Sequence, residues 1–141
     1  MGRVLGIDYG TKRIGTALSD EAKHSAFPHT ILSVTHDADA VRQLKQLIDS
    51  EDIDGVVIGL PLDQNGDEGL MAGRVRQFGE QLGQVSHHSI AYQDERMTSR
   101  ISQQRMQTHT TTRTSRGALD AIAAQEILQT YLERTYGPAE Y

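Results

Sequence analysis

Three carboxylate residues, Asp8, Glu95 and Asp120, have the surroundings expected of groups that do chemistry. Asp8 ends the apolar run Val4-Leu5-Gly6-Ile7 and is followed closely by Gly10-Thr11-Lys12. Such a run is typical of a strand buried on both faces, where a charge is costly unless a cation or hydrogen-bond donors meet it. Glu95 and Asp120 bound a segment that holds several arginines and no acidic residue. These three carboxylates are therefore the candidates for a shared site.

Carboxylates that converge from separate parts of a chain suit hard divalent cations, which need oxygen ligands, typically Mg²⁺ or Mn²⁺. Two such ions, roughly 3.5–4 Å apart, can activate a water and stabilise the leaving oxygen in phosphodiester hydrolysis. The sequence contains no cysteine, so any metal must use oxygen or imidazole ligands. No fourth carboxylate is evident, and the number of ions, one or two, stays open.

Each carboxylate also has a purely structural interpretation. Asp8 could cap a turn at a strand end, and Glu95 could pair with Arg96 or Arg100 on the surface. Asp120 could be an acid in the first turn of a helix, where it would meet the positive end of the macrodipole. The combination of the three favours a metal site over these separate roles.

The basic residues predict contacts with phosphate groups, which position a nucleic-acid backbone without reading its sequence. Arg96 could instead orient the carboxylate of Glu95, and Arg76 could be a solvated helix residue. The candidates for nucleic-acid binding are Lys12, Arg76, Arg96, Arg100, Arg113 and Arg116.

The hydrophobic pattern predicts an α/β fold with a five-stranded mixed sheet and helices on both faces. Three antiparallel strands in a meander are followed by two parallel strands that helices connect, and the strand of Asp8 is central. The expected strands are 3–9, 13–19, 30–34, 54–59 and 88–92, with 20–28 as a loop. The expected helices are 37–50, 71–82, 97–106 and 116–134, with a loop over 108–115 and a frayed tail from about 137.

Composition fits one globular domain over residues 1–141. The hydrophobic content is 37% and the formal net charge is −5. The sequence shows no signal-peptide pattern and no apolar run of membrane-spanning length, so we expect a cytoplasmic protein. The net acidity argues only weakly against nucleic acid, because five arginines lie in one acid-free segment between Glu95 and Asp120.

Four motifs, in order along nearly the whole chain, resemble those of the YqgF family, also called RuvX. The first is Ile7-Asp8-Tyr9-Gly10-Thr11-Lys12-Arg13-Ile14-Gly15, and the second is Val57-Ile58-Gly59-Leu60-Pro61. The third is Asp94-Glu95-Arg96-Met97-Thr98-Ser99, and the fourth is Arg116-Gly117-Ala118-Leu119-Asp120-Ala121-Ile122-Ala123-Ala124. The family comprises bacterial pre-16S rRNA nucleases that have also been described as Holliday junction resolvases.

The resemblance implies an RNase H-like fold and metal-dependent cleavage of structured nucleic acid. It assigns the catalytic role to Asp8, Glu95 and Asp120, and it favours processing of the 5′ end of precursor 16S rRNA in ribosome biogenesis. Many members carry a lysine shortly before the last aspartate, where this chain has Arg113 and Arg116. Arginine can also bind phosphate, so this difference affects how the phosphate is contacted and not the expected activity.

Alternative functions stay open on the sequence. A four-way DNA junction is a second possible substrate, and a resolvase would normally act as a symmetric dimer, so the chain could be a monomer or a homodimer. A module that binds nucleic acid without cutting would keep the arginines but would not need the three acids. Residues 6–11 also resemble the phosphate loop of actin-like and sugar-kinase ATPases, which close two such domains over ATP, whereas 141 residues supply one.

Overall fold

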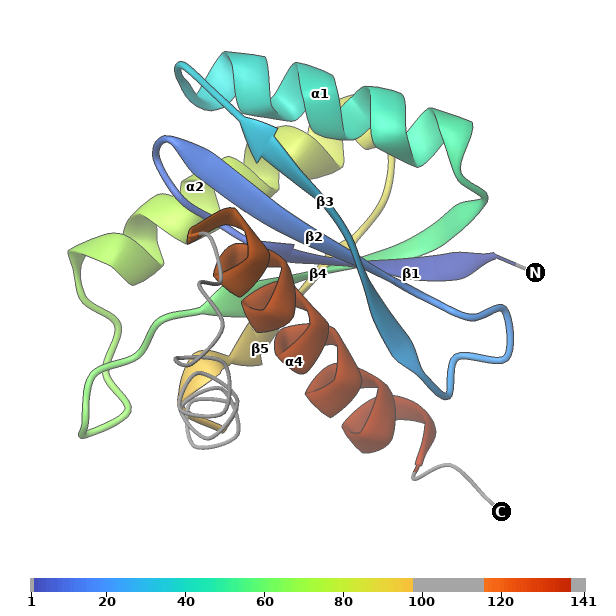
Figure 1. The fold of residues 1–141 in the computed structure, drawn as a ribbon. Helices are drawn as coiled ribbons and strands as arrows, with labels where there is room; N and C mark the ends of the chain where they lie inside the picture. The colour runs from blue at the N-terminus through green and yellow to red at the C-terminus, as the bar shows by residue number, and fades with distance from the viewer. Residues whose placement is uncertain (1, 98–115, 138–141) are drawn as a thin grey trace.

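The computed structural model describes residues 2–97 and 116–137, and the fold is an α/β sandwich around one mixed sheet (Figure 1). The sheet has five strands in the order β3-β2-β1-β4-β5. The strands are β1 (Arg3–Asp8), β2 (Arg13–Ser19), β3 (Ala26–Ser33), β4 (Ile53–Leu60) and β5 (Ile90–Asp94). The helical elements are α1 (Asp37–Ser50), α2 (Leu70–Ser86), the short 3₁₀ helix η1 (Glu95–Met97) and α4 (Arg116–Tyr136).

The pairing of the strands confirms the predicted topology. β1 pairs antiparallel with β2, and β2 pairs antiparallel with β3, which gives the meander. β4 is parallel to β1, and β5 is parallel to β4. The strand that carries Asp8 is therefore the central strand, as its continuous apolar run predicts.

The two faces of the sheet bury two separate apolar clusters, because successive side chains of a strand point to opposite faces. Leu5 and Ile7 of β1 pack in the larger cluster with residues of α1 and α2, such as Leu44 and Phe78. Val4 packs in the smaller cluster with Leu128 and other residues of α4. Figure 1 accordingly shows α1 and α2 on one side of the sheet and α4 on the other, which confirms the prediction of helices on both faces.

The third strand begins earlier than the sequence predicts. Residues 20–28 were expected to form a loop, yet β3 starts at Ala26 and includes Pro28, which lies opposite Ala17. Proline cannot donate to the ladder and is tolerated in edge strands, and β3 is the edge of this sheet. The irregular register between Gly15 and Ala17 lies beside it.

Several other boundaries differ by a few residues from the prediction. α2 and β4 are longer at both ends than expected, and β5 covers Ile90–Asp94 in place of residues 88–92. Of the helix expected over 97–106, only Met97 belongs to the described part, as the last residue of η1, and the predicted loop 108–115 lies outside it. α4 begins at Arg116 as predicted and ends before Gly137, whose φ is +87°.

None of the helices in the described ranges is long and apolar enough to cross a membrane.

Candidate active site at the end of the central strand

Asp8 and Glu95 lie at the same edge of the sheet because their strands run in parallel. Asp8 is the last residue of β1, and Glu95 follows Asp94, the last residue of β5. Asp8 lines a cleft of about 300 Å³ together with Asp120, Lys12 and Arg13. The structure thus brings the first and the last of the predicted site residues to one cleft.

Gly15 allows α4 to bring Asp120 to this edge. Gly15 is paired with Asp8 across β1 and β2. A Cβ atom at Gly15 would lie 2.1 Å from the backbone oxygen of Asp120, a distance at which only glycine fits. The direct contact between the helix backbone and the sheet therefore places Asp120 beside the strand end of Asp8.

Asp120 lies one turn deeper in its helix than the sequence predicts. α4 begins at Arg116, so Asp120 is in the second turn, and the first turn carries no acidic residue. Because the helix dipole acts mainly within the first turn, the alternative role of Asp120 as a partner of the macrodipole was wrong.

Gly59 makes room for the side chain of Glu95. A Cβ atom at Gly59 would lie 2.6 Å from Oε1 of Glu95 and 2.5 Å from Cδ1 of Ile127 in α4. The Glu95 side chain consequently lies over β4, the immediate neighbour of β1, on the face that α4 covers.

The charges of the three carboxylates interact. Burial raises the pKa of Asp8 to about 7, and the negative charges of Glu95 and then Asp120 add to the effect. Burial also raises the pKa of Glu95, with a further contribution from the charge of Asp94. Like charges held together in a partly dry site disfavour ionisation, which is the electrostatic situation that a bound cation relieves.

The donor set suits a hard cation in its chemistry, since all three groups offer carboxylate oxygens. As placed, however, no group of three acidic or histidine side chains within residues 2–97 and 116–137 converges on one point that could hold a metal ion. One reason is visible at Asp120, whose Oδ2 accepts a hydrogen bond of 3.0 Å from Nε of Arg13. The Asp120 side chain is held toward Arg13.

Arg13 is not among the candidate site residues that the sequence predicts. The residue belongs to the first motif, but its partner Asp120 is 107 positions away along the chain. No local pattern signals a pair at that separation. Only the packing of α4 on Gly15 brings the two residues together.

The predicted phosphate-binding residues have different surroundings. Lys12 is exposed and lines the cleft of Asp8 and Asp120. Arg76 binds both oxygens of Glu68, at 2.6 and 2.8 Å, and its guanidinium lies 4.8 Å from the ring centre of Tyr92. Arg96 is bound to Asp94 through several hydrogen bonds.

The remaining basic candidates cannot be located in the same way. Arg100 and Arg113 lie outside the described residues. Arg116 is the first residue of α4, but its side chain is outside the described part of the chain. The roles of these three arginines stay predictions.

Comparison with solved structures identifies the fold as RNase H-like, the fold of a large class of nucleases. The structure of RuvC from T. thermophilus in complex with a Holliday junction substrate matches with a TM-score of 0.63 at 10% identity, over 99% of each chain. The Holliday junction resolvase of fowlpox virus matches with a TM-score of 0.55 at 14% identity, over 94% of this chain and 99% of that one.

The chain belongs to the RuvX family, whose model is described as "RuvX: Holliday junction resolvase" and matches residues 2–134. A protein of Endomicrobium trichonymphae, provisionally named a pre-16S rRNA nuclease, is 37% identical over 137 residues, which cover 94% of this chain and 96% of the relative. A relative from Roseiflexus sp. (strain RS-1) with the same provisional name is 35% identical over 134 residues, 94% of each chain. Family membership makes this chain a nuclease, and it confirms the resemblance found in the four motifs.

Proposed function

We propose that the chain is a divalent-metal-dependent endonuclease in which Asp8, Glu95 and Asp120 form the catalytic site and ligate the metal. The observation that carries the proposal is the cleft at the end of the central strand, which Asp8 and Asp120 line together at the sheet edge where Glu95 follows β5. Burial and the charges of the other two carboxylates raise the pKa of Asp8, which supports the same site. Carboxylates gathered at one partly buried edge repel one another in a metal-free protein, and a divalent cation relieves that repulsion.

The proposed cofactor is Mg²⁺ or Mn²⁺, with one or two ions per site. When bound, such ions supply a water of lowered pKa and stabilise the charge on the leaving oxygen. The chain contributes the deprotonated carboxylates of Asp8 and Glu95, held by the ends of β1 and β5. Asp120 would complete the set once its hydrogen bond with Arg13 is broken, and the Arg13 guanidinium would then be available to a phosphate group.

The proposed substrate is precursor 16S rRNA near its 5′ end, cleaved in the cytoplasm. The names of relatives that are 35–37% identical over nearly the whole chain support this choice. We propose that Lys12, which lines the cleft, holds a phosphate of the bound strand. We propose Arg100, Arg113 and Arg116 as further phosphate contacts from the acid-free segment, and Arg76 as a contact farther along the surface.

A four-way DNA junction is the second candidate substrate. The description of the family and the likeness of the fold to junction resolvases favour it. A resolvase of this kind would require two copies of the chain to cut two strands symmetrically, whereas an rRNA nuclease could act as a monomer or a homodimer.

A cleavage assay that offers both substrates side by side tests the proposal. Labelled precursor rRNA and a synthetic four-way junction are incubated with Mg²⁺, Mn²⁺ or EDTA. Asp8→Asn is the inactive variant, and Asp49→Asn, which changes an exposed acid on α1, is the matched control. Metal-dependent cutting of the RNA by the parent and by Asp49→Asn, but not by Asp8→Asn, is the expected result.

Two other outcomes would change the conclusion. Symmetric cutting of the junction, with the RNA left intact, would select the resolvase. Full activity of Asp8→Asn, or activity in EDTA equal to that in Mg²⁺, would overturn the metal site.

A further inference from the structure

Arg96 is bound to its neighbour Asp94 in a way that fixes the chain around Glu95. Its backbone N–H donates to Oδ1 of Asp94 at 2.9 Å, and its Nη2 donates to Oδ2 at 2.8 Å. Nε lies 3.2 and 3.1 Å from the two oxygens of the same carboxylate. The backbone contact spans two residues and forms an Asx turn, a geometry that sets the local backbone conformation. The residue between the two partners is Glu95.

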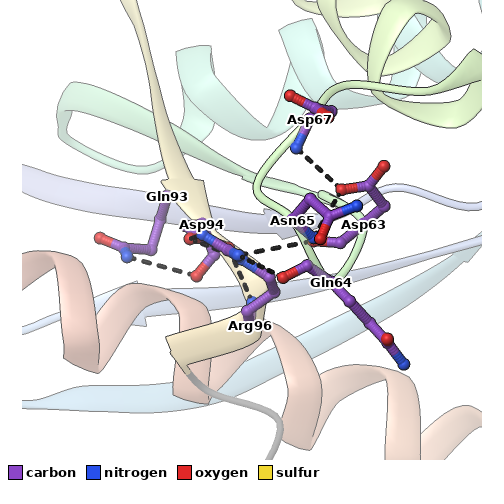
Figure 2. A network of polar contacts seen from close by, with 7 residues as sticks. All are labelled: Asp63, Gln64, Asn65, Asp67, Gln93, Asp94 and Arg96. Atoms are coloured by element: carbon purple, nitrogen blue, oxygen red, sulfur yellow. Dashed lines mark hydrogen bonds and ion pairs between the residues drawn. The ribbon is translucent and has the colours of Figure 1, made fainter.

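The same guanidinium reaches the loop between β4 and α2. Nη1 of Arg96 lies 3.4 Å from the backbone oxygen of Asp63 and 3.5 Å from that of Gln64. A Cβ atom at Gly66 would lie 3.4 Å from both Nη1 and Nη2, so the loop passes directly over the guanidinium. Figure 2 shows Arg96 between the carboxylate of Asp94 at the end of β5 and this loop.

The loop that Arg96 contacts is itself closely hydrogen-bonded. Oδ1 of Asp63 accepts the backbone N–H groups of Asn65 and Asp67, both at 2.9 Å. The backbone oxygen of Asp63 accepts the N–H of Gly66 at 3.0 Å, and Leu62 bridges to Glu68. A loop with this many internal bonds can act as a rigid support for Arg96.

Asp94 and Glu95 point to opposite sides of the sheet. Tyr92 packs in the cluster of α1 and α2, and Asp94, two residues farther along β5, shares its side of the strand. The Glu95 side chain instead lies over Gly59 beside Ile127 of α4. Arg96 therefore contacts the end of β5 on the side that faces α2, whereas the Glu95 carboxylate lies on the side that α4 covers.

We propose that Arg96 and Asp94 are positioning residues that hold Glu95 in place, with the 63–67 loop as their support. This inference rests on the proposed role of Glu95 as a metal ligand. It revises the expectation that Arg96 contacts phosphate, because the guanidinium is directed to Asp94 and to the loop. Lysine could replace arginine in a simple phosphate contact, but it cannot form the bidentate contact that Arg96 makes with the Asp94 carboxylate.

The experiment compares Asp94→Asn, Arg96→Gln, Arg96→Lys and the double variant Asp94→Asn/Arg96→Gln. Each single variant is expected to lower kcat about 10- to 100-fold and to raise the Mn²⁺ concentration for half-maximal activity, with the KM for nucleic acid unchanged. Because the two residues act as a unit, the double variant should be no worse than the poorer single variant. Arg42→Gln, which breaks the exposed pair with Asp39 on α1, is the matched control.

A second readout does not depend on catalysis. Hydrogen exchange at the amides of Asn65, Gly66 and Asp67 should become faster in Arg96→Gln and in Arg96→Lys, and should be unchanged in Arg42→Gln. Direct titration with Mn²⁺ in the absence of nucleic acid should show weaker binding in the same two variants.

Three results would contradict the inference in distinguishable ways. A raised KM in Arg96→Gln, restored by Arg96→Lys and not seen in Asp94→Asn, would make Arg96 a phosphate contact. Parent-like activity and exchange in Arg96→Gln, with Glu95→Gln inactive, would refute the positioning role alone. Full activity of Glu95→Gln would refute the proposed metal site, whatever the exchange data show.

Discussion

Nε of Arg13 donates a hydrogen bond of 3.0 Å to Oδ2 of Asp120, which joins the first residue of β2 to the second turn of α4. The pair lies in the cleft that Asp8 lines. In the metal-free protein, Arg13 therefore supplies positive charge beside two carboxylates and occupies one of the oxygens that a cation would need.

Arg13→Gln should bind Mn²⁺ more tightly than the parent protein, by a few-fold. The substitution removes a group that competes for Asp120 and a positive charge that repels the ion. The loss of thermal stability without metal should be small, because half-exposed ion pairs contribute about 0–1 kcal/mol. Titration with Mn²⁺ in the absence of nucleic acid measures the effect, with Arg42→Gln as a control for the loss of one arginine.

An unchanged or weaker affinity for Mn²⁺ in Arg13→Gln would contradict the competition. In that case, Arg13 would help to hold Asp120 in the geometry that binds the ion.

The raised pKa of Asp8 predicts a specific pH dependence of stability without metal. The pKa of Asp8 rises from its usual 3.8 to about 7 in the folded protein, so folding favours the protonated acid. Its contribution to stability is complete below pH 4 and is lost as the pH rises through about 7. The shift corresponds to about 4 kcal/mol at most, and the partial exposure of Asp8 reduces this value.

Asp8→Asn removes this contribution, because an amide does not ionise. In EDTA, the variant should gain stability relative to the parent between pH 5 and pH 8, and should be the more stable protein at pH 8. Urea unfolding of both proteins at the two pH values provides the measurement. Equal pH dependence in the two proteins would show that Asp8 is not the group that titrates.

The sheet and its order could be predicted from the sequence because the apolar runs of β1 and β4 are continuous and a helical pattern separates β3 from β4 and β4 from β5, which favours parallel strands. The start of β3 could not be predicted, because Pro28 is a reliable sign of a loop except in an edge strand, and the edge is known only from the complete sheet. The position of Asp8 at the end of the central strand followed from the same local pattern that defines the strand.

The contacts around the site depend on packing that the sequence does not encode locally. The pairing of Arg13 with Asp120 follows from the approach of α4 to Gly15, more than a hundred residues away. Arg96 is next to Glu95 in the sequence, yet its guanidinium turns to Asp94 and to the loop at Asp63, on the other side of the strand. The charge of Arg96 suggested a contact with phosphate, and its position next to Glu95 suggested an ion pair with that residue. Neither property predicts the direction in which the Arg96 side chain points.

Lys12 and Arg76 should differ in their effect on nucleic-acid binding. Lys12 lines the cleft, whereas Arg76 is bound to both oxygens of Glu68 and lies against Tyr92, so a phosphate contact of Arg76 would have to break that pair. In Lys12→Gln, the slope of log affinity against log salt concentration should become shallower by about one, the change expected when one phosphate contact is lost. In Arg76→Gln, the slope should change much less. The comparison uses binding titrations at several salt concentrations, with both substitutions made in the Asp8→Asn protein, which is expected not to cut the probe. A larger change of slope in Arg76→Gln than in Lys12→Gln would assign the main phosphate contact to α2.

Substitution of two glycines, Gly15 and Gly59, by alanine should separate the backbone contact that positions Asp120 from the space that the Glu95 side chain occupies. At Gly15, the new Cβ would meet the backbone oxygen of Asp120 at 2.1 Å, so α4 must shift, and we expect a loss of about 1–3 kcal/mol of stability together with the activity. At Gly59, the Cβ would meet the ends of two side chains, Glu95 and Ile127, which can rotate away. Gly59→Ala should therefore lose activity and Mn²⁺ affinity at a smaller cost in stability.

Gly73→Ala is the matched control for these two variants. Apart from the neighbouring backbone of its own helix, no atom of residues 2–97 and 116–137 lies within 4 Å of a Cβ at Gly73. The residue is inside α2, where alanine is favoured over glycine by about 0.5–1 kcal/mol. This variant should keep full activity and gain stability, as measured by urea unfolding and by the cleavage assay. If Gly59→Ala keeps parent-like activity while Gly15→Ala loses it, the position of the Glu95 carboxylate over β4 is not required for cleavage, and the catalytic assignment must rest on Asp8 and Asp120 alone.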